Sequence, residues 1–144
     1  TLPPQLDPRL TYLTIWDDSL VFVAAPFHPL AQAKNLNLHD LTDYPSLLPA
    51  AQTYTSQITL AEFEKQGAKP KVTMSNNSLE SIRMLVSIGL GWSVLPKTMV
   101  SHELQQLDIN LELHRQLGMV WHPGRSQSKA AQALVQLMQS DTSL

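Results

Sequence analysis

Apolar and polar positions along the chain form two kinds of pattern, short strand-like runs and longer helix-like spacings. Residues 20–25 are continuously apolar, which is typical of a strand covered on both faces. Shorter apolar or alternating runs predict further strands at residues 10–16, 46–48, 71–74, 92–95, 109–113 and 118–122. Helical spacing predicts helices at residues 56–66, 79–88, 98–106 and 128–139, and weakly at 36–41. This alternation of strands and helices with short connections predicts an α/β sheet.

Several residues mark the ends of the predicted helices. Gly67 is suited to cap the C-terminus of the helix at 56–66, and Gly89 to end the helix that begins near residue 79. Asn77, with Glu80 three residues later, predicts a capping-box-like start for that second helix. The stretch between the strand ending at Leu48 and the helix beginning at Ser56 has no clear period and is expected to be a loop.

Composition and charge narrow the class of protein. The 144 residues are 43% hydrophobic, enough for a packed core, and include no cysteine. The net charge of −2 disfavours direct contact with DNA phosphates by this segment. No apolar run approaches the length of a membrane span. The chain starts at Thr1 without a basic region or a signal-type apolar core, so we expect it to be a fragment.

The sequence offers no motif for catalysis or for a metal centre. The five histidines include no pair at i, i+4 spacing, and no Gly-x-Ser-x-Gly elbow occurs. Gly89 and Gly91 follow a predicted helix and precede a strand, which reverses the order of a dinucleotide fingerprint. His28 stands in a turn between Phe27 and Pro29, where a structural role is favoured over catalysis. We therefore predict no catalytic residue, no metal and no cofactor.

Two polar loops remain as candidates for binding a small molecule. Each follows a predicted strand and leads into a helix, at the sheet edge where α/β folds collect ligands. Capping is favoured over ligand binding for Asn77 or Ser78, whereas the first loop is longer than a cap requires. The candidate binding residues are Pro49, Ala50, Ala51, Gln52, Thr53, Tyr54, Thr55, Ser75 and Asn76.

Three segments in this order resemble the effector-binding domain of LysR-type transcriptional regulators. The first is the strand at 20–25 with Pro26-Phe27-His28-Pro29-Leu30 after it, similar to the family's Pro-x-His-Pro-Leu turn. The second, residues 40–48, resembles its Asp-Leu…Pro approach to the next strand. The third, residues 78–96, is similar to its helix, Gly-x-Gly and strand ending in proline. The resemblance extends over roughly residues 10–139.

The resemblance implies a type 2 periplasmic-binding-protein-like fold, a mixed sheet flanked by helices, with an effector in a cleft between two lobes. It assigns residues 1–16 to a lead-in and hinge strand and 17–112 to the second, regulatory lobe. Residues 113–144 then form the C-terminal strand and helix of a first lobe that is otherwise missing. The loop Pro49–Thr55 corresponds to the second-lobe loop that lines the family's cleft, and Ser75 and Asn76 lie near its rim.

The function implied is effector sensing by a cytoplasmic, bacterial DNA-binding regulator, not catalysis. DNA contact is expected through a winged helix-turn-helix absent from this chain, with self-association as a dimer or tetramer and no membrane. The alternative is a periplasmic-type solute-binding protein, which an export signal would distinguish. The residues expected to drive self-association are Met119, Val120, Trp121, Leu134 and Leu137.

Overall fold

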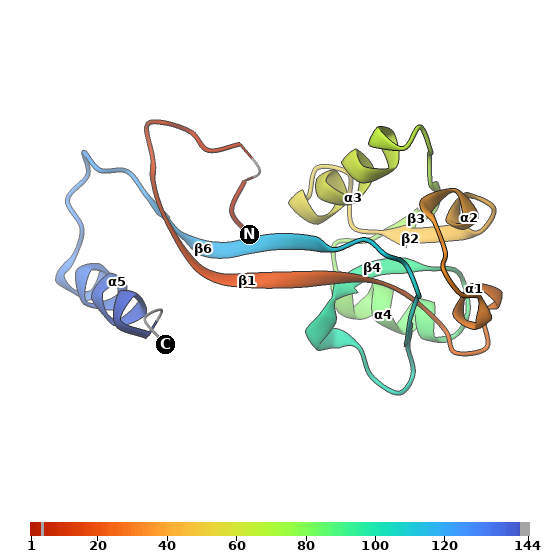
Figure 1. Cartoon of the computed structure of the whole chain (residues 1–144). Coiled ribbons are helices and arrows are strands. Elements are labelled where there is room, and N and C mark those ends of the chain that lie inside the picture. The colour runs from red at the N-terminus through yellow and green to blue at the C-terminus, as the bar shows by residue number, and fades with distance from the viewer. Residues whose placement is uncertain (4, 142–144) are drawn as a thin grey trace. The chain divides into compact units, whose positions relative to one another are not determined.

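The structure, a computed structural model, describes residues 1–3 and 5–141, with strands and helices alternating along the chain (Figure 1). The strands are β1 (Thr11–Ala24), β2 (Pro45–Leu48), β3 (Lys71–Ser75), β4 (Ser93–Pro96), β5 (Gln105–Gln106) and β6 (Leu113–Trp121). The helices are α1 (Pro29–Gln32), α2 (Leu38–Thr42), α3 (Tyr54–Lys65), α4 (Leu79–Ser87), the 3₁₀ turn η1 (Lys97–Met99) and α5 (Lys129–Asp141).

The chain divides into two compact units. Unit 1 comprises Thr1–Asp18 and Arg115–Leu144, and unit 2 comprises Ser19–His114. Strands β1 and β6 therefore each contribute residues to both units. Whether these units act as two lobes around an effector stays a prediction.

In unit 2 three strands run in the same direction. Strand β2 pairs with β3 in parallel, and a parallel bridge from Ser46 to Trp92 joins β2 to the start of β4. Strand β1 lies antiparallel to β4, with Leu20 opposite Pro96. The carboxyl ends of β2, β3 and β4 consequently meet at one edge of unit 2, and the connections after them supply the candidate site.

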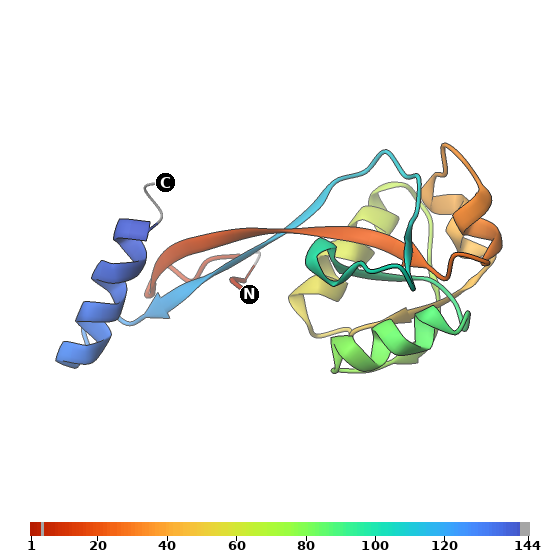
Figure 2. The same cartoon turned by 90° about the horizontal axis from the view of Figure 1, so that it is seen from below.

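The core of unit 2 is divided by its strands into two apolar clusters. Alternate residues of β1 enter one cluster or the other: Phe22 packs with Trp92 and Phe63, whereas Val23 packs with Ile82 and Val86 of α4. Helices α2 and α3 accordingly cover one face of the strands, and α4 covers the opposite face (Figures 1 and 2). The continuously apolar run at 20–25 is thus confirmed as a strand buried on both faces.

A glycine permits the close approach of β4 to β2. A Cβ atom added at Gly91 would lie 2.3 Å from the carbonyl oxygen of Pro45, closer than side chains approach backbone. The same carbonyl accepts a hydrogen bond from the Trp92 N–H at 3.0 Å. Gly91 therefore serves the close packing of β4 against β2.

Several predicted elements differ from the structure. The separate strands expected at 10–16 and 20–25 are one strand, β1, because Asp17 and Asp18 continue the extended backbone instead of turning. The helix expected at 98–106 was wrong: only η1 and the short strand β5 form there. The strand expected at 109–113 was also wrong for most of its length, since Ile109 makes only an isolated bridge and β6 starts at Leu113. The segment after Pro26 was expected as a loop but includes helix α1, capped by His28.

Unit 1 contains the paired outer parts of β1 and β6 and helix α5. A Cβ atom added at Gly118 would meet the Leu13 carbonyl oxygen at 2.2 Å, which shows how closely the two strands approach. Arg115 Nε donates to Asp18 Oδ2 at 2.7 Å, and these side chains are only 14% and 7% exposed. This ion pair joins the two strands at the boundary of unit 1.

Candidate functional site

The structure brings the two predicted polar loops together. Leu48 at the end of β2 lies opposite Ser75 at the end of β3 in the parallel register. The Asn76 N–H donates to the Leu48 carbonyl at 3.3 Å, which continues the pairing by one residue. The loop starting at Pro49 and the residues following β3 are therefore neighbours, as expected from the parallel order of these strands.

The first loop is shorter than the sequence predicted. Helix α3 begins at Tyr54, two residues before the expected start at Ser56, so Tyr54 and Thr55 lie in its first turn. Thr53 is the N-cap: its hydroxyl accepts a hydrogen bond from the Ser56 N–H at 3.3 Å and donates to the Ala50 carbonyl at 2.8 Å. The Thr53 hydroxyl proton is thus already used within the loop, which the sequence pattern did not reveal.

Exposure divides the nine predicted site residues into three groups. Ala51, Gln52 and Ser75 are exposed, and Pro49 and Thr55 are buried. The remaining four residues are half-buried: Ala50, Thr53, Tyr54 and Asn76. No side-chain hydrogen bond of Gln52 or Ser75 is found within the described part of the chain. The amide of Gln52 and the hydroxyl of Ser75 are therefore the side-chain groups best placed to meet a ligand.

The start of α4 differs in one residue from the prediction. Its N-cap is Ser78, whose hydroxyl accepts from the Ser81 N–H at 3.2 Å, so the second of the two predicted caps is confirmed and the capping box at Asn77 was wrong. Asn76 Oδ1 accepts from the Ser78 N–H at 2.8 Å, forming a local turn before the helix. Asn76 therefore orients the connection between β3 and α4 as well as standing at the candidate site.

Lys97 is a residue at the same sheet edge that the sequence prediction missed. It follows Pro96, the last residue of β4, which pairs opposite Leu20 of β1. Its side chain is exposed and forms no ion pair with any described residue. The sequence did contain a signal, because a strand–helix–strand connection from β3 to β4 makes these strands parallel and places their carboxyl ends at one edge.

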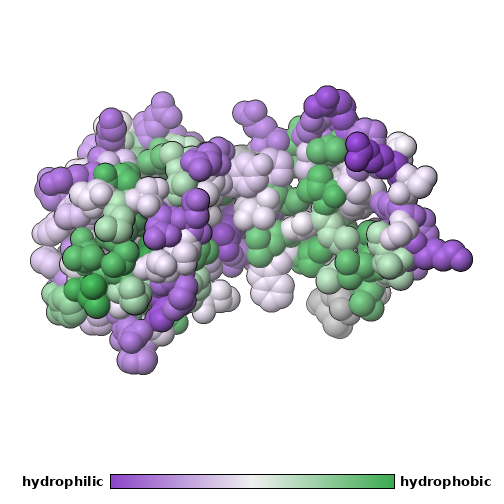
Figure 3. Space-filling view, turned by 180° about the vertical axis from the view of Figure 1, so that it is seen from behind, coloured by the Kyte–Doolittle hydropathy of each residue, from purple (hydrophilic) through white to green (hydrophobic). Residues whose placement is uncertain are grey.

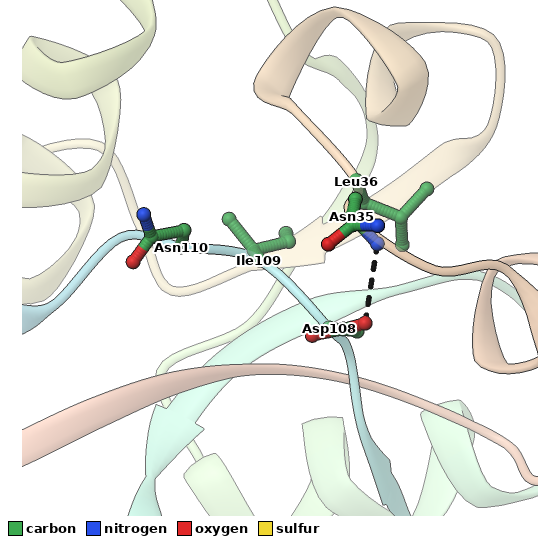
Figure 4. A pocket seen from close by; sticks show the side chains of 5 residues that line it. All are labelled: Asn35, Leu36, Asp108, Ile109 and Asn110. Carbon is green, nitrogen blue, oxygen red and sulfur yellow. Dashed lines mark hydrogen bonds between the residues drawn. The ribbon is translucent and has the colours of Figure 1, made fainter.

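Two of the hollows in unit 2 bear on the question of ligand binding. One, of about 560 Å³, is open to solvent and lined by Asn35, Leu36, Asp108, Ile109 and Asn110 (Figure 4). There the Asn35 N–H donates to Asp108 Oδ2 at 3.1 Å, which ties the two segments of its wall together. The other, of about 230 Å³, lies beside Ser19 of β1 and Lys97. The predicted loop Pro49–Thr55 does not line either of them.

The histidine singled out in the sequence has a structural environment. His28 is 7% exposed; its Nδ1 accepts from the Leu30 N–H at 3.2 Å, and its ring packs edge-on against Tyr44. Burial lowers the pKa of His28 below the ordinary histidine value, because the charged imidazolium is less well solvated there. These contacts support the structural role predicted for His28.

Among the described residues no cluster of three or more histidine, cysteine or acidic side chains could hold a metal ion. No helix within 1–3 and 5–141 is long and apolar enough to span a membrane.

Comparison with protein families and curated proteins gives a consistent result. The family model of the LysR substrate binding domain matches residues 1–143. A probable RuBisCO transcriptional regulator of Synechocystis sp. is 30% identical over 143 residues, 93% of this chain and 41% of that protein. A RuBisCO operon transcriptional regulator of Acidithiobacillus ferrooxidans is 30% identical over 128 residues, 85% of this chain and 41% of the relative. The chain thus spans about four-tenths of the length of these relatives.

Solved structures give the same fold. The regulatory domain of Synechocystis PCC6803 CcmR, in complex with 2-PG, has a TM-score of 0.85 and 26% identity, covering 99% of this chain and 70% of that one. The effector-binding domain of QuiR, in complex with shikimate, has a TM-score of 0.84 and 21% identity, covering 95% and 67%. The predicted fold class is thereby confirmed as that of such effector-binding domains, a mixed sheet flanked by helices.

Proposed function

Because the chain belongs to the LysR substrate-binding domain family, we propose that it is the effector-sensing domain of a DNA-binding transcriptional regulator. The match of the family model across residues 1–143 carries this proposal. The effector binds at the polar edge of unit 2, and binding favours one arrangement of the protein over another. The chain itself performs no catalysis in this mechanism.

The accessible polar groups of the edge are the contacts we propose for the effector. They are the Ser75 hydroxyl, the Gln52 amide and the backbone N–H groups of the loop that begins at Pro49. Asn76 and Thr53 hold this edge in shape through their hydrogen bonds to Ser78 and Ser56. The half-buried Tyr54 and Ala50 supply apolar contact next to these polar groups.

A ligand screen with matched variants tests the effector site. We use 2-PG and shikimate as first probes, since structurally similar domains were solved with them. A binding ligand raises the melting temperature of the chain, because it stabilises only the folded state. Gln52→Ala combined with Ser75→Ala should weaken this shift at least several-fold. Both side chains are exposed, so the double variant should fold normally.

The matched control removes one serine hydroxyl and one glutamine amide from unit 1 instead of unit 2. Ser126→Ala with Gln136→Ala changes exposed residues of unit 1 and should leave the ligand-induced shift unchanged. An equal response in both double variants would show that the assignment of the site to the edge of unit 2 is wrong. The family membership would stand in that case.

We also propose how the remaining activities of a regulator are distributed. DNA contact is made by a winged helix-turn-helix outside these 144 residues, in keeping with the net charge of −2. Such a protein works where the DNA is, in the bacterial cytoplasm. The coding sequence upstream of Thr1 tests this: a helix-turn-helix supports regulation, whereas a signal peptide would instead indicate a periplasmic solute-binding protein.

Self-association as a dimer or tetramer is the last part of the proposal. Val120, Leu134 and Leu137 of unit 1 are exposed, as the sequence led us to expect, whereas Met119 and Trp121 are half-buried. Unit 2 has further exposed apolar side chains, Phe27, Met84, Ile88 and Leu90. Hydrophobic residues also gather on the face shown in Figure 3. Exposed apolar side chains in such number favour contact with another protein surface.

A further inference from the structure

We propose that the hollow beside Lys97 is a second small-molecule site, which binds a small carboxylic acid with an apolar body. The hollow lies in unit 2 between Ser19–Val21 of β1, Lys97 and the segment 109–114. The hollow shares the sheet edge of the effector contacts proposed above but has different lining residues, since those contacts follow β2 and β3, whereas the hollow lies beside β4 and β1. The proposal does not require that the effector assignment be correct.

The apolar part of the hollow is built into the core. Leu20 and Leu113 line it and are 2% and 3% exposed, so both are held rigidly by their neighbours. Ile109 and Leu111, which are half-buried, line it as well. The accessible apolar surface of the hollow therefore comes from Ile109 and Leu111, and an apolar group placed against these two side chains loses contact with water.

The rim of the hollow carries an available positive charge. Lys97 is exposed and forms no ion pair within the described part of the chain, so a ligand need not displace a protein carboxylate from its ammonium. Its place is fixed by β4, because Pro96 pairs directly opposite Leu20 on the wall of the hollow. A carboxylate bound here gains a charge-assisted hydrogen bond.

The other polar and charged groups of the rim are compatible with binding of a carboxylate at Lys97. The Glu112 side chain is 93% exposed and therefore well solvated, and its Oε2 lies 3.7 Å from His114 Nε2. Ser19, Gln106 and Asn110 add neutral hydrogen-bonding groups. The volume of about 230 Å³ is below the usual ~300–1,000 Å³ of ligand pockets, so only a small acid fits.

Titration of the ¹⁵N-labelled chain with isobutyrate tests the proposal, with isobutyramide as a neutral probe of the same shape. Isobutyrate should shift the amide signals of residues 19–21 and 109–114, and isobutyramide should bind clearly more weakly. Lys97→Gln should weaken isobutyrate binding about fivefold, as expected for loss of one exposed ion pair. Lys97→Arg should keep most of the affinity, because it keeps the charge.

Lys69→Gln is the matched control, since it removes an equal charge from an exposed lysine of unit 2 outside the hollow. It should bind isobutyrate like the unmodified chain, and the amide spectrum shows directly whether each variant is folded. Equal affinity for acid and amide, or an unchanged affinity in Lys97→Gln, would overturn the proposal. Signals that shift at residues 49–55 and 75–76 instead would overturn it too, while leaving the proposed effector site intact.

Discussion

Buried His28 illustrates how one side chain links local structure to pH. Its imidazole caps α1 as a hydrogen-bond acceptor, a role that requires the neutral ring. Burial lowers its pKa in the folded chain, whereas in the unfolded chain the group titrates near its ordinary value of 6.5. The unfolded state therefore binds more protons between these two values, and protonation favours unfolding.

We expect the stability supported by His28 to be fully present above about pH 6.5 and to be lost as the pH falls below it. His28→Asn keeps a cap acceptor but removes the titration. Urea unfolding from about pH 7.5 to about pH 5.5 should therefore show a smaller loss of stability in His28→Asn than in the unmodified chain. His102→Asn, at an exposed histidine, should retain the full loss. If the unfolding free energy fell by the same amount with pH in all three proteins, the proposed contribution of buried His28 to this pH dependence would be wrong.

Thr53 shows that a residue in a candidate ligand-binding loop can have a mainly structural role. Its hydroxyl makes two hydrogen bonds at the start of α3, so Thr53→Ala should lower the free energy of unfolding by about 1 kcal/mol. Thr53→Ser retains the hydroxyl and should lose less than half of that. Denaturant titration measures both. A Thr53→Ala variant as stable as the original chain would show that the cap contributes nothing.

At the scale of elements, β1 and β6 are held together by the ion pair of Asp18 and Arg115. The pair is largely buried, and removing one partner takes this direct ionic contact away from a charge that is poorly exposed to water. Asp18→Asn or Arg115→Gln should each lower the unfolding free energy by roughly 3 kcal/mol, and the double variant by less than the sum. Arg9→Gln, which breaks an exposed ion pair with Asp7, is the control and should have little effect. Additive losses would mean that the two charges do not interact.

Elements defined by dense apolar runs could be predicted from the sequence, and those defined by distant partners could not. The buried run at 20–25 and the helix ended by Gly89 are confirmed, because each carries its own burial pattern. The segments at 98–106 and 109–113 follow no such rule: β5 exists because Gln105 and Gln106 pair with β1, some eighty residues earlier in the chain. The position of Asp17 and Asp18 within a continuous strand likewise depends on pairing with β6 and on Arg115.

The candidate site was predictable to a similar extent. The alternation of strands and helices predicts that the polar loops after the strands meet at one edge of the sheet. The hydrogen bond between Leu48 and Asn76 confirms this prediction. The internal hydrogen bonds of Thr53 could not be predicted, because they depend on whether α3 starts at Tyr54 or two residues later. Lys97 lies outside the loops rich in hydroxyl and amide groups, and its place beside β1 depends on the antiparallel pairing of Pro96 with Leu20.

At the scale of the whole molecule, the exposed side of α5 makes self-association a measurable expectation. Leu134 and Leu137 are 45% and 58% exposed. Leu134→Glu with Leu137→Glu should lower the fraction of oligomer in sedimentation velocity runs over a range of concentrations. Their exposure means that the fold should tolerate the change. Gln132→Glu with Gln136→Glu adds the same charge to the same helix and should leave association unchanged. Oligomers that persist in the first variant would direct the search to Ile88 and its neighbours in unit 2.

The division of the chain into two units has a consequence for how coding segments can be exchanged between related genes. Unit 2 is one uninterrupted segment, Ser19–His114, whereas unit 1 is assembled from the two flanking segments. The ends of the inner segment are neighbours, since Ser19 and His114 line the same hollow. A single exchange of coding sequence can therefore replace the polar edge and Lys97 together, as a cassette, while the flanking sequence keeps its own reading frame and partners. Ligand preference in such a protein can change by recombination in one step.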